Sequence, residues 1–195
     1  MDRKVFVKFS PVFYIMIAMM LLMLPLKWML AAAIAATHHE LCHLVAIRLC
    51  RGDIHSFSLS VDGANLDVSS LSPAKELICS LAGPIGGLSL LLFSRWIPRI
   101  AVCAAFQSLY NLLPIYPLDG GRALWCGITM LLPPKKAGKF CKCIEKVCLS
   151  AILLTAVYGS VHLKLGIASL FPAILIFTHT KFRKTPCKHR PQRLQ

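Results

Sequence analysis

Charge, and negative charge in particular, is scarce in this sequence. Only 15% of its 195 residues are charged, whereas soluble domains average about 25%. Aspartate and glutamate together number only 8. Apolar residues make up 56% of the chain, and its mean hydropathy is +0.65. This composition excludes a disordered chain and disfavours an ordinary soluble globule.

The sequence also lacks a recognisable disulfide framework and any nucleic-acid-binding motif. Its 9 cysteines lie mostly in or beside apolar runs, where cysteine behaves as a small buried hydrophobe. A net charge of +14 would suggest nucleic acid in a soluble protein. Here the positive charges lie between apolar runs and near the C-terminal end. Membrane topology and contact with the lipid bilayer explain them better, and no nucleic-acid partner is expected.

Long apolar runs make up most of the sequence. A membrane-spanning helix needs about 20 mostly apolar residues. Residues 9–49 are too long for one span and for the core of a signal peptide, and they fit two spans joined at Pro25-Leu26-Lys27. Later uncharged stretches cover 77–94, 100–118, 147–163 and 165–180. The sequence therefore predicts an all-α polytopic membrane protein with about six transmembrane helices.

Two of these predicted spans contain residues that interrupt helices. Gly83-Pro84 and Gly86-Gly87 lie in the third span, and Pro114 and Pro117 lie near the end of the fourth. Irregular backbone at membrane depth is tolerated only where it is buried in protein or lines a wet cavity. Both predicted breaks therefore indicate a functional site.

The distribution of basic residues predicts the orientation of the spans. On the six-span map, one side of the membrane has only Lys27, Arg95, Arg99 and Lys164, and the other side has the remaining 18 of the 22 basic residues. Cytoplasmic segments carry the excess of lysine and arginine. We therefore expect both termini in the cytoplasm.

One segment after the second span has the pattern of strands. Apolar and polar residues alternate on both sides of Asp62-Gly63 between residues 57 and 68. This alternation predicts a small cytoplasmic β-hairpin. The hairpin either pairs with an unwound substrate strand or only packs on the face of the membrane.

Glu40 and Asp119 are the only acids within or directly against an apolar span. A charge there is costly unless it is paired or bound. Glu40 belongs to His39-Glu40-Leu41-Cys42-His43, an H-E-x-x-H motif. On a helix His39 and His43 share one face, so they can hold one zinc ion with Glu40 as general base. Two core histidines satisfied by hydrogen bonds are the alternative.

Asp119 can complete the predicted zinc site, because catalytic zinc usually has three protein ligands and a water. The span map puts Asp119 at the cytoplasmic end of the fourth span, at a depth similar to His39 and His43. Pro117 and Gly120-Gly121 are predicted to open the helix around Asp119 and admit water. The alternative is an aspartate that caps the following helix.

The combination of motifs resembles the site-2 protease family of intramembrane zinc metalloproteases. It pairs His39-Glu40-x-x-His43 with a second motif, Asn111-Leu-Leu-Pro-Ile-Tyr-Pro-Leu-Asp119-Gly-Gly-Arg122, and Ser80-Leu-Ala-Gly83-Pro84 matches a third family feature. The six-span layout is most similar to the branch of the stage IV sporulation protease, which processes a membrane-tethered sigma-factor precursor.

The resemblance implies a role for each site residue. His39, His43 and Asp119 would be ligands of one zinc ion per chain, and Glu40 would be the catalytic base. Asn111 would orient the substrate peptide or the developing oxyanion, with a polar contact between helices as the alternative.

The resemblance also implies a domain plan and a function. Residues 1–180 would form a membrane-embedded metalloprotease domain with its catalytic core at about 28–132, and 181–195 would be a basic cytoplasmic tail. The expected protein is a multi-pass protease of the bacterial cell membrane. Its partners would be a membrane-tethered protein substrate and regulatory membrane proteins. A catalytically silent scaffold and a metal-ion transporter are the alternative functions.

Overall fold

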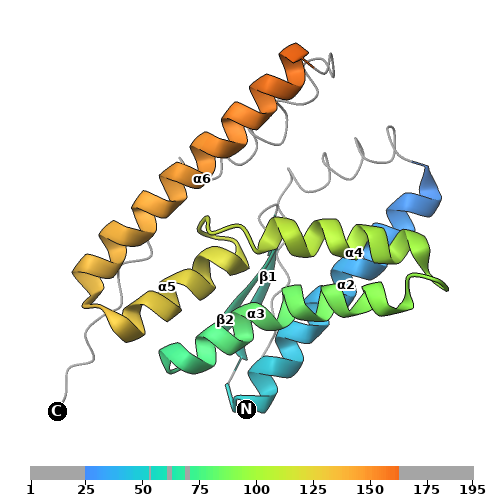
Figure 1. Cartoon of the computed structure of the whole chain (residues 1–195). Helices are drawn as coiled ribbons and strands as arrows, with labels where there is room; N and C mark the ends of the chain where they lie inside the picture. The colour runs from blue at the N-terminus through green and yellow to red at the C-terminus, as the bar shows by residue number, and fades with distance from the viewer. Residues whose placement is uncertain (1–24, 53, 61–62, 69–70, 163–195) are drawn as a thin grey trace.

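The structure is a computed structural model that describes residues 25–52, 54–60, 63–68 and 71–162. The first predicted span, the last predicted span and the basic tail lie outside the described residues. Helices dominate the described part, which confirms the predominantly helical architecture. They are α2 (Leu26–Leu49), α3 (Pro73–Ser89), the 3₁₀ helix η1 (Leu90–Phe93), α4 (Pro98–Asn111), α5 (Asp119–Leu131) and α6 (Pro134–His162) (Figure 1).

Two strands lie between α2 and α3 in the chain. β1 (Ile54–Ser60) pairs antiparallel with β2 (Gly63–Val68), and the last pair of the register joins Ser60 and Gly63. The predicted turn residue Asp62 lies outside the described residues. A cytoplasmic location for this pair of strands stays a prediction.

Helices α2 to α5 pack around one another through small residues. α2 contacts α3 and α4, and α3 also contacts α4 and α5. Ala31 and Ala35 are buried on α2, Ala101 and Ala104 on α4, and Ala123 on α5. Because these side chains are small, the backbones can approach closely. α6 packs against α5 at its start and then extends away from the other helices (Figure 1).

Large apolar side chains point outward from this bundle. Leu41 on α2, Ile85 on α3 and Phe106 on α4 are more than half exposed, at 54%, 60% and 73%. In a protein dissolved in water such large apolar residues are more often buried in the core. Small residues at helix contacts with large apolar residues outside are typical of helices packed in lipid.

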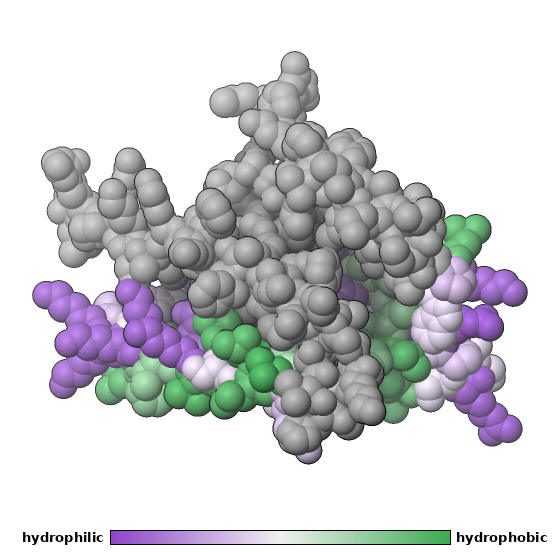
Figure 2. Space-filling model, turned by 90° about the horizontal axis from the view of Figure 1, so that it is seen from above, coloured by the Kyte–Doolittle hydropathy of each residue, from purple (hydrophilic) through white to green (hydrophobic). Residues whose placement is uncertain are grey.

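Polar and apolar residues occupy separate regions of the outer surface. Figure 2 shows hydrophilic residues at two opposite ends of the view, with hydrophobic residues between them. Among the described residues, two helical stretches are long and apolar enough to cross a membrane, Leu26–Leu49 and Pro73–Phe93. Six spans therefore stay a prediction.

The predicted break in the third span is wrong. α3 continues through Gly83, Pro84 and Gly87 as one helix. Proline removes one hydrogen bond from a helix interior, but neighbouring helices make this tolerable in membrane proteins. The glycines face other helices, where a Cβ on Gly83 would overlap His43 and one on Gly87 would overlap Ser108. Their small size allows close packing and does not end the helix.

The predicted break at Pro114 and Pro117 is confirmed, but the prediction that the fourth span extends to Leu118 and ends at Asp119 is wrong. α4 ends at Asn111, and Asp119 begins α5 after the irregular segment 112–118. Pro114 and Pro117 lie in that segment, and the Tyr116–Pro117 peptide bond is cis. Proline disfavours helix at its own position and at the one before it. The segment 119–146, expected as a connection between spans, belongs largely to α5 and the first part of α6.

Candidate metal centre

The H-E-x-x-H motif lies in the middle of α2, on its buried face. His39 and His43 follow Ala31 and Ala35 at intervals of four residues, and all four are buried. This interval keeps the side chains on one face of the helix. The two imidazoles meet edge to face, with ring centroids 4.8 Å apart, and their Nε2 atoms are 3.2 Å apart.

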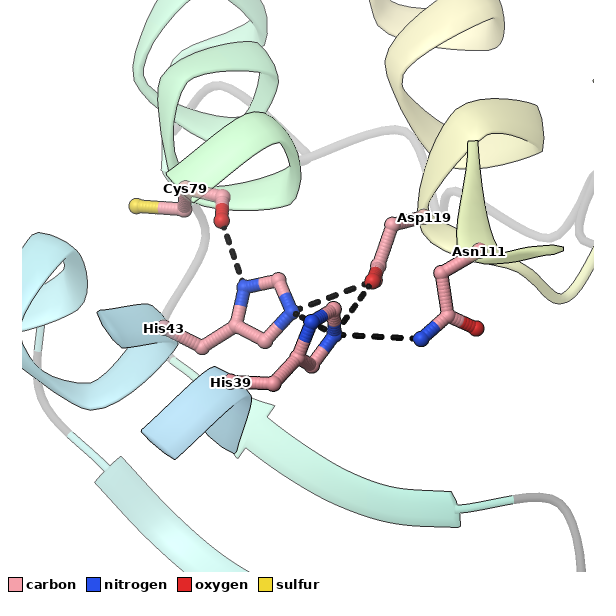
Figure 3. A network of polar contacts seen from close by, with 5 residues as sticks. All are labelled: His39, His43, Cys79, Asn111 and Asp119. Atoms are coloured by element: carbon pink, nitrogen blue, oxygen red, sulfur yellow. Dashed lines mark hydrogen bonds and ion pairs between the residues drawn. The ribbon is translucent and has the colours of Figure 1, made fainter. Parts of the chain in front are cut away.

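Asp119 reaches these histidines from the first turn of α5. Its Oδ2 lies 3.1 Å from the Nε2 of His39 and 3.1 Å from the Nε2 of His43 (Figure 3). The position before α5 that would cap the helix is Leu118, without a side-chain hydrogen bond. The alternative in which Asp119 caps the next helix is therefore wrong. Its negative charge still suits the positive end of the helix dipole.

Two glycines place Asp119 against the segment that precedes it. A Cβ on Gly120 would overlap the carbonyl of Leu112, and a Cβ on Gly121 would overlap the backbone of Ile115. The first turn of α5 therefore lies directly on residues 112–115. This contact aims the side chain of Asp119 at α2 across the bundle.

The three side chains form a nearly equilateral triangle of donor atoms. Its edges are 3.1, 3.1 and 3.2 Å long. Ligand atoms about 2.0–2.1 Å from a tetrahedral zinc ion are about 3.3 Å apart. Two imidazoles and one carboxylate are also a ligand set of the kind that catalytic zinc takes. Among the described residues, no other group of three histidine, cysteine or acidic side chains is arranged to hold a metal ion.

A main-chain carbonyl determines which nitrogen of His43 faces this triangle. His43 Nδ1 lies 2.7 Å from the carbonyl oxygen of Cys79 on α3 (Figure 3). A carbonyl only accepts hydrogen bonds, so Nδ1 carries a proton and donates it. In a neutral imidazole, Nε2 is then a bare lone pair. This lone pair faces the Asp119 carboxylate, so either a proton or a metal ion must lie between them.

Asn111 and Glu40 lie close to the same centre. The Nδ2 atom of Asn111, the last residue of α4, is 3.2 Å from His39 Nε2. Glu40 is half-buried on α2, next to His39 in the chain. All five residues that the sequence singled out are thus on elements that meet at one place, although their individual roles stay predictions.

Sequence reasoning associated Gly83 and Pro84 with the site, but it missed the contacts that α3 makes with His43. Cys79 acts through its main chain, which residue types cannot reveal. Gly83 was assigned to a helix break, whereas it faces His43. The spacing Gly83-x-x-x-Gly87 was the available signal, because small residues four apart allow close contact between membrane helices.

Comparison with known proteins identifies the fold. The sequence matches no protein-family model and no curated protein. Among solved structures it is similar to the site-2 protease from Methanocaldococcus jannaschii, with a TM-score of 0.62, 18% sequence identity and 92% of each chain covered. The two chains therefore share a fold over nearly their whole length.

Proposed function

We propose that this protein is an intramembrane zinc metalloprotease that hydrolyses a peptide bond in or near a transmembrane segment of a membrane-tethered protein. The observation that carries this proposal is the triangle formed by His39, His43 and Asp119. It lies inside a helical bundle that shares its fold with a site-2 protease. This set of donor atoms favours zinc, and we propose one zinc ion per chain.

The packing supports a location in a lipid membrane, and the proposal of a multi-pass protein of the bacterial cell membrane rests on the apolar runs and on the resemblance to the sporulation branch. Small residues line the helix contacts and large apolar residues face outward, as in lipid-embedded bundles. The start of α2, which contains Lys27, and the connection from α3 to α4, which contains Arg95, lie at the same end of the molecule in Figure 1. The charge map groups both on the non-cytoplasmic side, so this arrangement agrees with the map from which cytoplasmic termini are proposed.

Glu40 has a different role in the proposed reaction from His39, His43 and Asp119, which would bind the metal ion. Bound zinc would supply Lewis acidity, which polarises a carbonyl group and lowers the pKa of a water molecule. Glu40 accepts a proton from the attacking water while the water oxygen bonds to the scissile carbonyl carbon. Glu40 then donates this proton to the amine nitrogen as the C–N bond breaks. The water is thus divided between the two products.

Access to the peptide bond requires a locally unwound substrate, because a helix engages its own carbonyl groups in hydrogen bonds. β1 and β2 form a sheet of two strands among the described residues, so each strand has one edge that is unpaired within that sheet. Such an edge can accept an extended peptide by β-augmentation. In this proposal Asn111, whose Nδ2 lies 3.2 Å from His39 Nε2, orients that peptide or the developing oxyanion.

The substrate class follows from the location of the site. The substrate is a membrane-tethered protein, and regulatory membrane proteins are further partners in this proposal. A sigma-factor precursor is the specific candidate, and it rests on the resemblance to the sporulation branch.

The Glu40→Gln variant tests the proposed reaction. Glutamine keeps the shape of glutamate and removes the proton acceptor, so zinc content and folding should be retained. Cleavage of tagged, membrane-tethered candidate precursors should fall at least about 100-fold. Glu145→Gln makes the same chemical change on α6, away from the triangle, and is the matched control.

The same experiment distinguishes a protease from a catalytically silent scaffold and from a metal-ion transporter. A scaffold would be indifferent to Glu40→Gln, and a transporter would move metal ions without cleaving a precursor. If Glu40→Gln and Glu145→Gln cleave a precursor at the same rate as the wild type, the mechanism is wrong.

A further inference from the structure

His43 makes two different contacts through its two ring nitrogens. Nδ1 donates to the Cys79 carbonyl at 2.7 Å, and Nε2 lies 3.1 Å from Asp119 Oδ2. His39 differs, because its buried Nδ1 has no hydrogen-bond partner in the described part of the chain. A backbone group on α3 therefore orients one of the two histidines and not the other.

The contact with Cys79 requires the imidazole to lie directly against α3. Gly83 is one turn beyond Cys79, on the same face of this helix. A Cβ at position 83 would overlap Nε2, Cε1 and Cδ2 of His43. The ring therefore occupies the space that any other residue at position 83 would fill with its side chain.

We propose that Gly83 is a positioning residue for the metal centre. The absence of a side chain there lets His43 reach the Cys79 carbonyl, which holds the proton on Nδ1 and turns the Nε2 lone pair toward His39 and Asp119. This inference rests on the proposed metal centre and assigns α3 a role in it. Hydrogen-bonded partners of metal-binding histidines fix the tautomer and the ring orientation in this way.

The Gly83→Ala variant should lose metal affinity and keep its fold. The atoms that a new Cβ meets belong to a side chain that can rotate away, so the helices need not separate. Alanine is also a better helix former than glycine. The displaced His43 loses both its carbonyl partner and its place in the triangle. Metal affinity should fall about 10- to 100-fold, as for other changes to partners of ligand histidines.

Two other glycines provide matched controls. Gly87 is one turn further along α3, and a Cβ there would overlap the Ser108 hydroxyl on α4. Gly87→Ala therefore crowds the same helix away from His43. Gly127 on α5 has nothing within 4 Å of an added Cβ, so Gly127→Ala tests the substitution without crowding.

The test is a cobalt titration of the purified full-length chain in detergent. Co²⁺ bound by nitrogen and oxygen ligands absorbs visible light, so the spectrum reports both affinity and ligand geometry, without any substrate. We expect the wild type, Gly87→Ala and Gly127→Ala to bind Co²⁺ with similar affinity, and Gly83→Ala to bind it 10- to 100-fold more weakly, as predicted above. Circular dichroism should show equal helix content in all four proteins.

Each other outcome has a definite meaning. Wild-type protein that binds no Co²⁺ overturns the metal centre and the inference that rests on it. Wild-type affinity in Gly83→Ala overturns the role of Gly83 alone, and so does an equal loss in Gly83→Ala and Gly87→Ala. If Gly83→Ala does not fold, nitrogen-15 spectra of zinc-loaded, histidine-labelled wild type decide the matter. They should show the His43 proton on Nδ1, and zinc coordination through Nδ1 would overturn the inference.

Discussion

The two sides of the candidate metal centre are built differently. The helix side consists of His39 and His43 on α2 with Cys79 and Gly83 on α3, and both helices continue without interruption there. The loop side runs from Asn111 to Gly121 and includes the irregular segment 112–118 and the first turn of α5. Helical periodicity brings the two histidines together, whereas the loop side needs a close fit of backbone on backbone to place Asp119.

The loop side should consequently be the more sensitive to an added methyl group. In Gly121→Ala the new Cβ meets the backbone of Ile115, which cannot rotate away as a side chain can. We expect the variant to lose about 3 kcal/mol of stability or to fail to accumulate. Thermal unfolding in detergent measures this loss. Gly127→Ala in the same helix is the control, and equal melting temperatures for the two variants would contradict the close fit.

Substitution of Asn111 tests whether the loop side takes part in catalysis or only supplies the metal ligand Asp119. In Asn111→Ala we expect zinc to be retained and cleavage to fall about 100-fold, the usual cost of losing one oxyanion donor. Gln107→Ala, which removes an amide one turn earlier on α4, should cleave at the wild-type rate. Reduced stability with normal cleavage in Asn111→Ala would show that the residue makes only a polar contact between helices.

The ion pair between α3 and α5, which joins the helices on either side of the centre, should matter least. Arg122 on α5 lies 3.9 Å from Glu76 on α3, and their side chains are 40% and 38% exposed. Solvent screens such a pair, so its coupling energy should be less than about 1 kcal/mol. A double-mutant cycle with Arg122→Ala and Glu76→Gln measures the coupling. A value above about 2 kcal/mol would mean that the pair helps to hold the two sides together.

The same contrast explains how much of the site could be predicted from the sequence. The spacing of His39 and His43 fixes their common face on any helix, so their proximity needed no tertiary information. Asp119 was predicted to join them, but at the end of a span and not at the start of α5. Pro114 and Pro117 indicate that a helix must stop, whereas the restart of the helix depends on Gly120 and Gly121 packing on the preceding segment.

The fold was predictable to a similar degree. Composition and long apolar runs were sufficient to predict a mainly helical chain. The course of α3 through Pro84 was missed, because the same glycines and proline can either end a helix or permit close packing. Only the positions of neighbouring side chains, such as His43 against Gly83, decide between these outcomes.

Zinc content tests most directly whether the helix side and the loop side hold one metal ion between them. Elemental analysis of the purified chain in detergent should find about one zinc ion per wild-type molecule, as expected for one triangle of ligands. Asp119→Ala should lose the zinc. His38→Ala should retain it, because His38 faces the carbonyl of Gly86 at 3.1 Å and lies outside the triangle. Unchanged zinc content and affinity in Asp119→Ala would contradict the account.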